Sequence, residues 1–171
     1  MLSSEQNIGQ PIQQNGPEDQ HENIQDPEDE KKPGKLVWII DDNSAGVAAV
    51  LRLAKMVTSM RSNGAEYKHF QTGEDAVADF SVLAADEEGT LPTIILMDYK
   101  LDDYVESPKF RTGVEVIAEL RQIAEDNKRR LPEIIAFSSE SSYTDELLSS
   151  GANSSIKKTD FPGVKKFFES L

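Results

Sequence analysis

Hydrophobic and polar positions change their spacing in a regular alternation from about residue 36 to the end of the chain. Short, nearly unbroken apolar runs, typical of strands covered on both faces, alternate with stretches in which apolar residues recur every three or four positions. The runs predict strands and the three-to-four spacing predicts helices. The predicted strands are 36–40, 66–70, 93–97, 133–137 and 154–156, and the predicted helices are 44–60, 73–85, 113–126, 143–149 and 161–171.

Turn and capping residues separate these segments. Thr72 precedes the second predicted helix as its N-cap, and Asp75 stands three residues later, at the acidic position of a capping box. The longest expected loop is the irregular stretch 99–112. Loops of this length in a compact domain are usually functional or mobile. We expect it either to shape partner recognition or cover a site, or to be a tolerated surface insertion.

The order of the segments indicates the fold class. Strands that alternate with helices predict an α/β fold, in which five βα units form a doubly wound, five-stranded parallel sheet with helices on both faces. A chain of 171 residues is most simply one folded domain, which we place at 36–171.

The first 35 residues have a different composition. Segment 1–35 is rich in Gln, Asn, Glu, Asp, Pro and Gly, and it holds eight acids against three lysines. Such a segment buries too little apolar surface to offset its ordering entropy, so we expect a disordered tail. A solubilising extension is favoured over a tether or a partner-binding segment.

Composition narrows the class of function. The net charge of −13 disfavours nucleic-acid binding, which depends on basic surfaces, and also disfavours contact with anionic membranes. There is no cysteine, which excludes disulfides and thiolate metal sites. The apolar runs are near five residues, too short for a membrane span, and no secretion signal is visible. We therefore expect a cytoplasmic protein.

Polar residues that can bind metal ions or phosphate follow the predicted strands. The first strand ends in Asp41 and Asp42, the third in Asp98, the fourth in Ser138, and the fifth is followed by Lys158. Because the carboxyl ends of parallel strands meet at one edge, these groups are expected to converge there. Carboxylates suit Mg²⁺, and a hydroxyl and a lysine can bind phosphate oxygens. The pattern favours a metal-assisted phosphate site.

Simpler interpretations exist for several of these residues. Asp41 and Asp42 could only cap the first helix, although Asp98 and Lys158 make that account weaker. Ser139 is best explained as part of a turn, and His69 as an ordinary sheet residue. Trp38 is best explained by core packing. Lys158 could be a solvated charge among neighbouring lysines, or Lys157 could take its place, but its position after the fifth strand and the count from Gly151 favour Lys158 as the phosphate ligand.

From residue 36 onward the chain resembles the receiver domain of two-component response regulators, a flavodoxin-like fold. Each motif alone is weak, but five in this order are specific together. The matching motifs are Ile39-Ile40-Asp41-Asp42-Asn43, Thr72-Gly73-Glu74-Asp75-Ala76, Ile95-Leu96-Met97-Asp98, Ala136-Phe137-Ser138-Ser139 and Gly151-Ala152-Asn153-Ser154-Ser155-Ile156-Lys157-Lys158.

The resemblance implies a role for each site residue. Asp98 would accept a phosphoryl group from a histidine kinase or a phosphotransfer protein. Asp41, Asp42, Asp98 and the backbone carbonyl of Lys100 would hold Mg²⁺, while Ser138 and Lys158 would bind phosphoryl oxygens.

The resemblance also implies how such a chain would signal. It would be a stand-alone receiver that assists its own phosphorylation and dephosphorylation and is otherwise not an enzyme. Its output would be contact with a downstream protein target, and a phosphorylation-dependent dimer is one form that this could take.

The chain departs from the family pattern in three places. Leu101 and Asp102 stand where the family often has a proline after the phosphorylated aspartate. Thr159, in place of a cis proline, follows Lys158, and the sequence leaves open whether that peptide bond is cis or trans. Ser155 occupies the position of the aromatic residue that swings inward in the family, which puts the usual readout in doubt.

Three rival functions follow from these features. A non-phosphorylated pseudo-receiver, an interaction module without the switch, is favoured by the missing aromatic and proline but opposed by the complete acid set. A phosphatase of the haloacid dehalogenase type would need an acid where Lys100 stands. A DNA-binding regulator is disfavoured by the charge and by the lack of a second domain.

Overall fold

The computed structural model describes residues 34–59, 64–102, 106 and 108–171. The expected disordered tail lies, for its first 33 residues, outside the described residues, and so do residues 103–105 and 107 of the long loop. The folded part begins with the first strand, at Leu36.

Five parallel strands form one sheet in the order β2-β1-β3-β4-β5. This is the flavodoxin-like order, in which the direction of winding reverses between β1 and β3. The predicted fold class is thereby confirmed. The strands are β1 (Leu36–Ile40), β2 (Glu66–Phe70), β3 (Ile94–Met97), β4 (Glu133–Ser138) and β5 (Ser154–Lys157).

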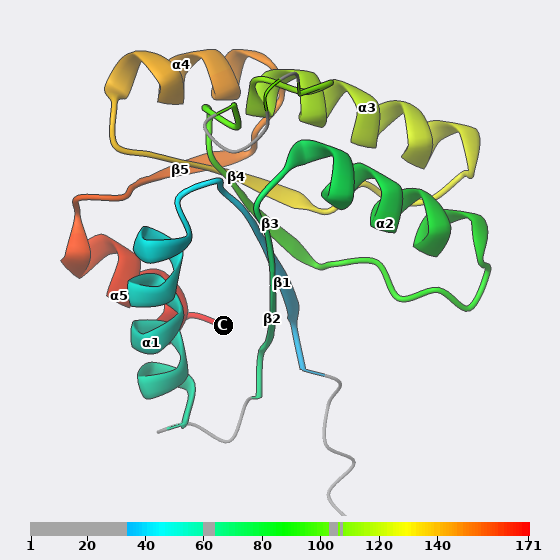
Figure 1. Cartoon of the computed structure of the whole chain (residues 1–171). Helices are drawn as coiled ribbons and strands as arrows, with labels where there is room; N and C mark the ends of the chain where they lie inside the picture. The colour runs from blue at the N-terminus through cyan, green and yellow to red at the C-terminus, as the bar shows by residue number, and fades with distance from the viewer. Residues whose placement is uncertain (1–33, 60–63, 103–105, 107) are drawn as a thin grey trace, which may run out of the picture. The chain divides into compact units, whose positions relative to one another are not determined.

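Five helices follow the strands in alternation. Figure 1 shows α1 and α5 on one side of the sheet, with α2 and α3 on the other. The helices are α1 (Ser44–Ser59), α2 (Gly73–Ala85), α3 (Gly113–Asp126), α4 (Ser141–Ser149) and α5 (Phe161–Glu169). None of the helices within the described residues is long and apolar enough to cross a membrane.

The central strands are buried on both faces, and successive side chains serve opposite cores. Trp38 and Ile40 belong to the core beneath α2 and α3, whereas Val37 and Ile39 belong to the core beneath α1 and α5. Burial on both faces explains why these strands are continuous apolar runs in the sequence.

Most element bounds agree with the sequence prediction, and the differences lie at the ends of elements. β4 and β5 each run one residue further than expected, because Ser138 and Lys157 are partners in the parallel ladder. β3 starts one residue later than expected, at Ile94. α4 begins two residues earlier, at Ser141, and α5 ends at Glu169 and not at the last residue.

Side-chain caps fix the helix starts that follow β2 and β3. The Oγ1 of Thr72 accepts a hydrogen bond from the backbone N–H of Asp75, which confirms the predicted cap of α2. A capping box joins Thr112 to Glu115 at the start of α3, and the sequence prediction did not include it. Each cap satisfies N–H groups that a helix start leaves open.

Candidate functional site

Three acidic side chains meet at the carboxyl edge of the sheet. Asp41 and Asp42 follow β1 and Asp98 follows β3, and all three are buried. One carboxylate oxygen of each lies within 4.8 Å of the others. β1 and β3 are neighbours in the sheet, and the edge between them is the point where the strand order reverses. The acids therefore occupy the place where open α/β sheets bind ligands.

A lysine that follows the edge strand β5 completes this cluster. The Nζ of Lys158 lies 2.7 Å from an Oδ of Asp41 and 2.7 Å from an Oδ of Asp98. Its backbone N–H donates to the carbonyl of Ser138 at 3.0 Å, which continues the contact between β4 and β5. The sequence favoured Lys158 over Lys157 as the lysine that faces the acids, and the structure agrees, because Lys158 contacts both acids whereas Lys157 is exposed.

The peptide bond after this lysine adopts the ordinary form. The described chain contains no cis peptide bond, so the bond between Lys158 and Thr159 is trans. Of the two possibilities that the sequence left open, the trans bond is the one found.

Backbone contacts place Asp98 firmly. Its N–H donates to the carbonyl of Ile40 at 2.9 Å, and the N–H of Gly113 donates to the carbonyl of Tyr99 at 2.7 Å. A Cβ added to Gly113 would lie only 2.1 Å from the carbonyl oxygen of Asp98. The start of α3 can approach the backbone of Asp98 this closely only because residue 113 has no side chain.

Burial changes the acidity of Asp98. Desolvation raises the pKa of its carboxyl to about 6, and the nearby charge of Asp41 adds to this rise, whereas the Lys158 ammonium opposes it. An ionised carboxylate is therefore less stable at this position than in water. A bound cation would favour the ionised form.

The donor set fits a small divalent cation. Three buried carboxylates face one ammonium group, so ionisation of all three leaves two negative charges without compensation from this lysine. Mg²⁺ and similar hard cations prefer carboxylate and carbonyl oxygens together with water. Lys100, the predicted carbonyl ligand, lies two residues past Asp98 and forms a β-bridge with Thr112. Its role in metal binding stays a prediction.

The remaining predicted phosphate ligand, Ser138, is buried at the end of β4. Its neighbour Ser139 is exposed, as expected of a turn residue, and so is Ser155 on β5. The position that carries an aromatic residue in the resembling family thus holds a small, solvated side chain here. The phosphate-binding role of Ser138 remains a prediction.

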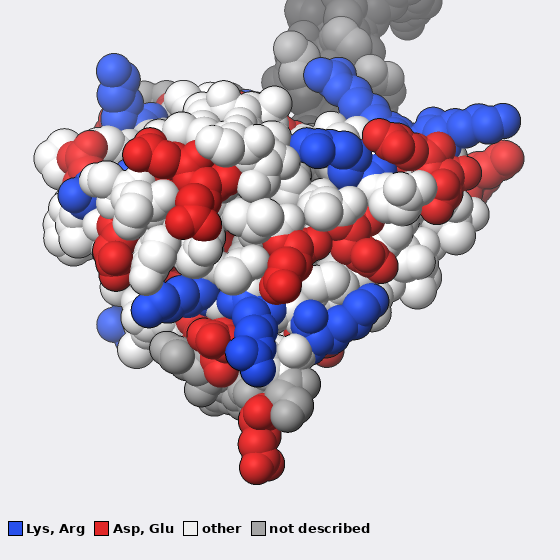
Figure 2. Space-filling view, turned by 90° about the horizontal axis from the view of Figure 1, so that it is seen from above, with Lys and Arg blue, Asp and Glu red and all other residues white. Residues whose placement is uncertain are grey.

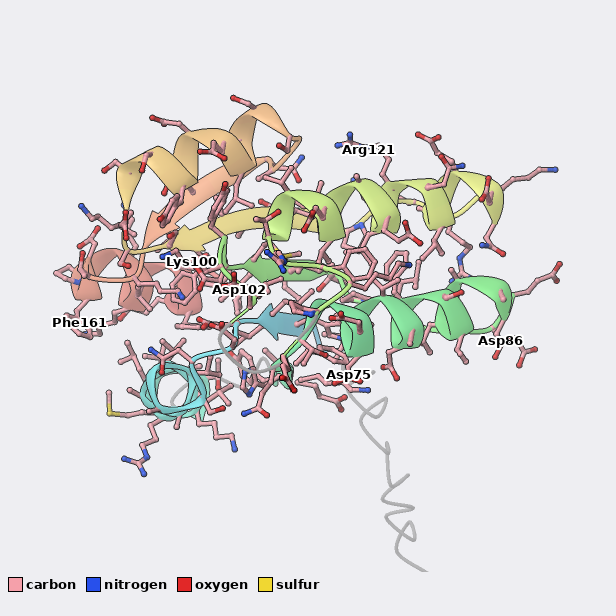
Figure 3. The ribbon with its side chains drawn as sticks, turned by 45° about the horizontal axis from the view of Figure 1, so that its top comes forward. Asp75, Asp86, Lys100, Asp102, Arg121 and Phe161 are labelled. Atoms are coloured by element: carbon pink, nitrogen blue, oxygen red, sulfur yellow. The ribbon has the colours of Figure 1, made fainter. Side chains whose placement is uncertain are left out.

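The described ends of the long loop after Asp98 pair with each other. Leu101 donates its N–H to the carbonyl of Arg111 at 3.0 Å, beside the bridge between Lys100 and Thr112. Both Leu101 and Phe110 are buried. The two arms of the loop therefore pair with each other, and Figure 3 shows Lys100 and Asp102 on the arm that leaves β3.

An aromatic contact joins this segment to α4. The rings of Tyr99 and Tyr143 stack with centroids 4.3 Å apart and an interplanar angle of 3°. The Tyr99 hydroxyl donates to a carboxylate oxygen of Glu146, and the Lys100 ammonium lies 5.4 Å from the centre of the Tyr143 ring. The residue next to Asp98 thus contacts α4 directly, which no local sequence pattern indicated.

Charge is mixed on the surface seen from above. Figure 2 shows Lys and Arg side chains interspersed with Asp and Glu on that face, and they do not form one broad basic area. Phosphate-backbone binding needs clustered positive charge, so this face offers little to a nucleic acid.

The comparisons with known proteins concern the fold. No family model matches the sequence, and no curated protein does so either. Solved structures do match. A CheY-like response regulator receiver domain protein from Methanospirillum hungatei superposes with a TM-score of 0.53 at 17% identity, covering 80% of this chain and 95% of that one.

Two further matches have slightly higher scores. The Mn²⁺-bound form of the response regulator Rcp1 has a TM-score of 0.55, and the phosphorylated cyanobacterial phytochrome response regulator RcpA has one of 0.54. Each is 22% identical to this chain, and each alignment covers 80% of this chain and 90% of the other. The chain therefore has the fold of response regulator receiver domains.

Proposed function

We propose that this receiver fold serves as the receiver of a response regulator, in which Asp98 accepts a phosphoryl group from a histidine kinase or a phosphotransfer protein. One observation carries the proposal. The Asp98 carboxylate lies in a buried cluster with two further acids and contacts the Lys158 ammonium at 2.7 Å. This combination supplies a nucleophile, metal ligands and a fixed positive charge in one place.

For phosphoryl transfer, the protein mainly has to position the reacting groups and to neutralise charge on the phosphoryl oxygens. A carboxylate oxygen of Asp98 forms the new bond to phosphorus while the bond to the donor's leaving atom breaks. Asp41, Asp42, Asp98 and the Lys100 carbonyl would hold Mg²⁺, which supplies positive charge for the phosphoryl oxygens. Lys158 and Ser138 then bind further phosphoryl oxygens.

In this role the chain assists its own modification and does not turn over a separate substrate. Its partners are a phosphoryl donor and a downstream protein that reads the modified state. A dimer formed on phosphorylation is one route for that reading.

Acetyl phosphate with Mg²⁺ tests the proposal directly, with intact mass as the readout. We expect wild type to gain one phosphoryl group, Asp98→Asn to gain none, and Asp102→Asn to behave as wild type. Asp102 is a matched control, because it is an exposed acid on the same segment. Uptake by Asp98→Asn, or no uptake by wild type that retains its circular dichroism spectrum, would contradict the proposal.

One observation favours a second candidate, a pseudo-receiver that binds partners without phosphorylation. Ser155 is small and exposed where the resembling family has its moving aromatic residue. The phosphorylation assay separates the two functions. A folded wild-type chain that binds neither Mn²⁺ nor a phosphoryl group would support the pseudo-receiver.

A further inference from the structure

The edge strand β2 contacts the acidic site through its side chains. The Nε2 of His69 lies 2.8 Å from the backbone carbonyl oxygen of Asp41. A carbonyl oxygen only accepts, so Nε2 carries a proton and donates it. Residue 69 is the partner of Ile39 in the β1–β2 register, so its side chain reaches two residues along β1 to make this bond.

A second donor lies two residues further along the chain. The Nε2 of Gln71 donates to the hydroxyl of Ser44, the first residue of α1. His69 lies on β2, and Gln71 directly follows the last residue of that strand. Together they contact both ends of the short turn 41–44, which joins β1 to α1 and carries the two acids.

The bond from His69 completes the set of contacts around Asp41. The Asp41 N–H donates to the carbonyl of Phe70 at 3.0 Å, and its carboxylate accepts from the N–H of Asn43 at 3.0 Å and pairs with Lys158. The carbonyl that accepts from His69 belongs to the peptide group between Asp41 and Asp42. Fixing that peptide plane fixes the direction in which the Asp42 side chain leaves the backbone.

We propose that His69 and Gln71 are positioning residues, whose donated hydrogen bonds hold the turn 41–44 so that the carboxylates of Asp41 and Asp42 converge on a divalent cation. The inference rests on the proposed function. Outer contacts of this kind orient metal ligands, and their loss typically costs about 10- to 100-fold in metal affinity.

Two substitutions at position 69 separate hydrogen bonding from packing. His69→Phe keeps a ring but has no donor, whereas His69→Gln keeps an N–H near the Nε2 position. Glu66→Gln is the matched control, because it changes an exposed residue at the far end of the same strand. The readout is the Mn²⁺ dissociation constant of the full chain, measured by electron paramagnetic resonance of the free ion.

We expect His69→Phe to weaken Mn²⁺ binding about 10-fold, with His69→Gln within about threefold of wild type and Glu66→Gln unchanged. Gln71→Met, which keeps the length of the side chain and removes its donor, should weaken binding about threefold. This variant keeps the proposal testable if His69→Phe does not fold.

Three outcomes would overturn the proposal. Unchanged affinity in both donorless variants would mean that the bonds do not position the acids. Affinity of His69→Gln as weak as that of His69→Phe would assign the effect to the imidazole itself and not to its donor. Absence of Mn²⁺ binding by wild type would remove this inference together with the proposed metal site, whereas the first two outcomes leave the proposed function intact.

Discussion

The two sides of the sheet's carboxyl edge are built differently. Around β1 and β3 the acids are buried, and Asp41 has partners for its N–H, its carbonyl and both carboxylate oxygens. Along β5, by contrast, Ser154, Ser155 and Lys157 are exposed. The acids and the lysine that the sequence placed at this edge therefore lie close together, whereas β5 lacks the aromatic residue that the family resemblance leads us to expect.

This difference suggests that the two parts of such a domain can change independently. A phosphoacceptor site needs buried charges at fixed distances, and few substitutions satisfy that requirement. Transmitting a change at the site to the surface requires only a contact whose geometry changes with the site. In this chain the stacked pair of Tyr99 and Tyr143 supplies a contact between the acceptor segment and α4 that does not pass through β5.

The largest predicted effect comes from removing the cation of the buried cluster. Lys158→Met leaves Asp41 and Asp98 without their 2.7 Å partner, and we expect the free energy of unfolding to fall by about 3–4 kcal/mol. Urea unfolding in EDTA measures this loss. Lys157→Met is the control, and as an exposed neighbour it should stay within about 0.5 kcal/mol of wild type. Equal losses in both variants would refute the contrast between the two lysines.

The second prediction concerns pH and follows from the raised pKa of Asp98. The folded carboxyl, with a pKa of about 6, keeps its proton to higher pH than the unfolded one, with an ordinary value of 3.8. The folded state therefore binds more protons between these values, and stability falls as the pH rises through them. Relative to Asp98→Asn, wild type should lose at most roughly 3 kcal/mol, since each pKa unit is worth ~1.4 kcal/mol.

The measurement for this prediction is a series of urea unfolding curves for wild type and Asp98→Asn from about pH 3.5 to 7.5, without divalent cations. Other groups titrate in both proteins, so the difference in unfolding free energy isolates Asp98. A difference that is independent of pH, or that favours wild type as the pH rises, would mean that burial does not disfavour the charged carboxylate.

The smallest predicted effect comes from a substitution on β5, the exposed strand of the comparison. Ser155→Tyr restores the aromatic residue type at an exposed position, and we expect a change in unfolding free energy within about 0.5 kcal/mol. Phosphoryl uptake from acetyl phosphate should equal that of wild type. A large loss of either would show that residue 155 is coupled to the acids after all.

The sequence was sufficient to predict the sheet, the alternation of helices and the edge at which the acids meet. Parallel strands bring their carboxyl ends together, so Asp41, Asp42 and Asp98 could be placed from the strand pattern alone. The bounds of β1 and α2 agree with the prediction because a continuous apolar run defines the strand and the Thr72 cap defines the start of the helix.

Contacts between elements distant in sequence could not be predicted in this way. The bond from His69 to the Asp41 carbonyl and the stack of Tyr99 on Tyr143 depend on register and side-chain direction, and a local pattern of apolar residues carries neither. The pairing of Lys100 with Thr112 likewise joins two arms of a segment that has no strand pattern in the sequence.

Aromatic placement gives this chain two separate optical reporters. Trp38, its single tryptophan, is fully buried beside Phe70 and Phe80, so its emission should follow global unfolding. Tyr99 directly follows Asp98 in the chain and stacks on Tyr143, so tyrosine absorbance and emission should respond to changes at Asp98. Modification and denaturation can then be recorded in one cuvette without an attached dye.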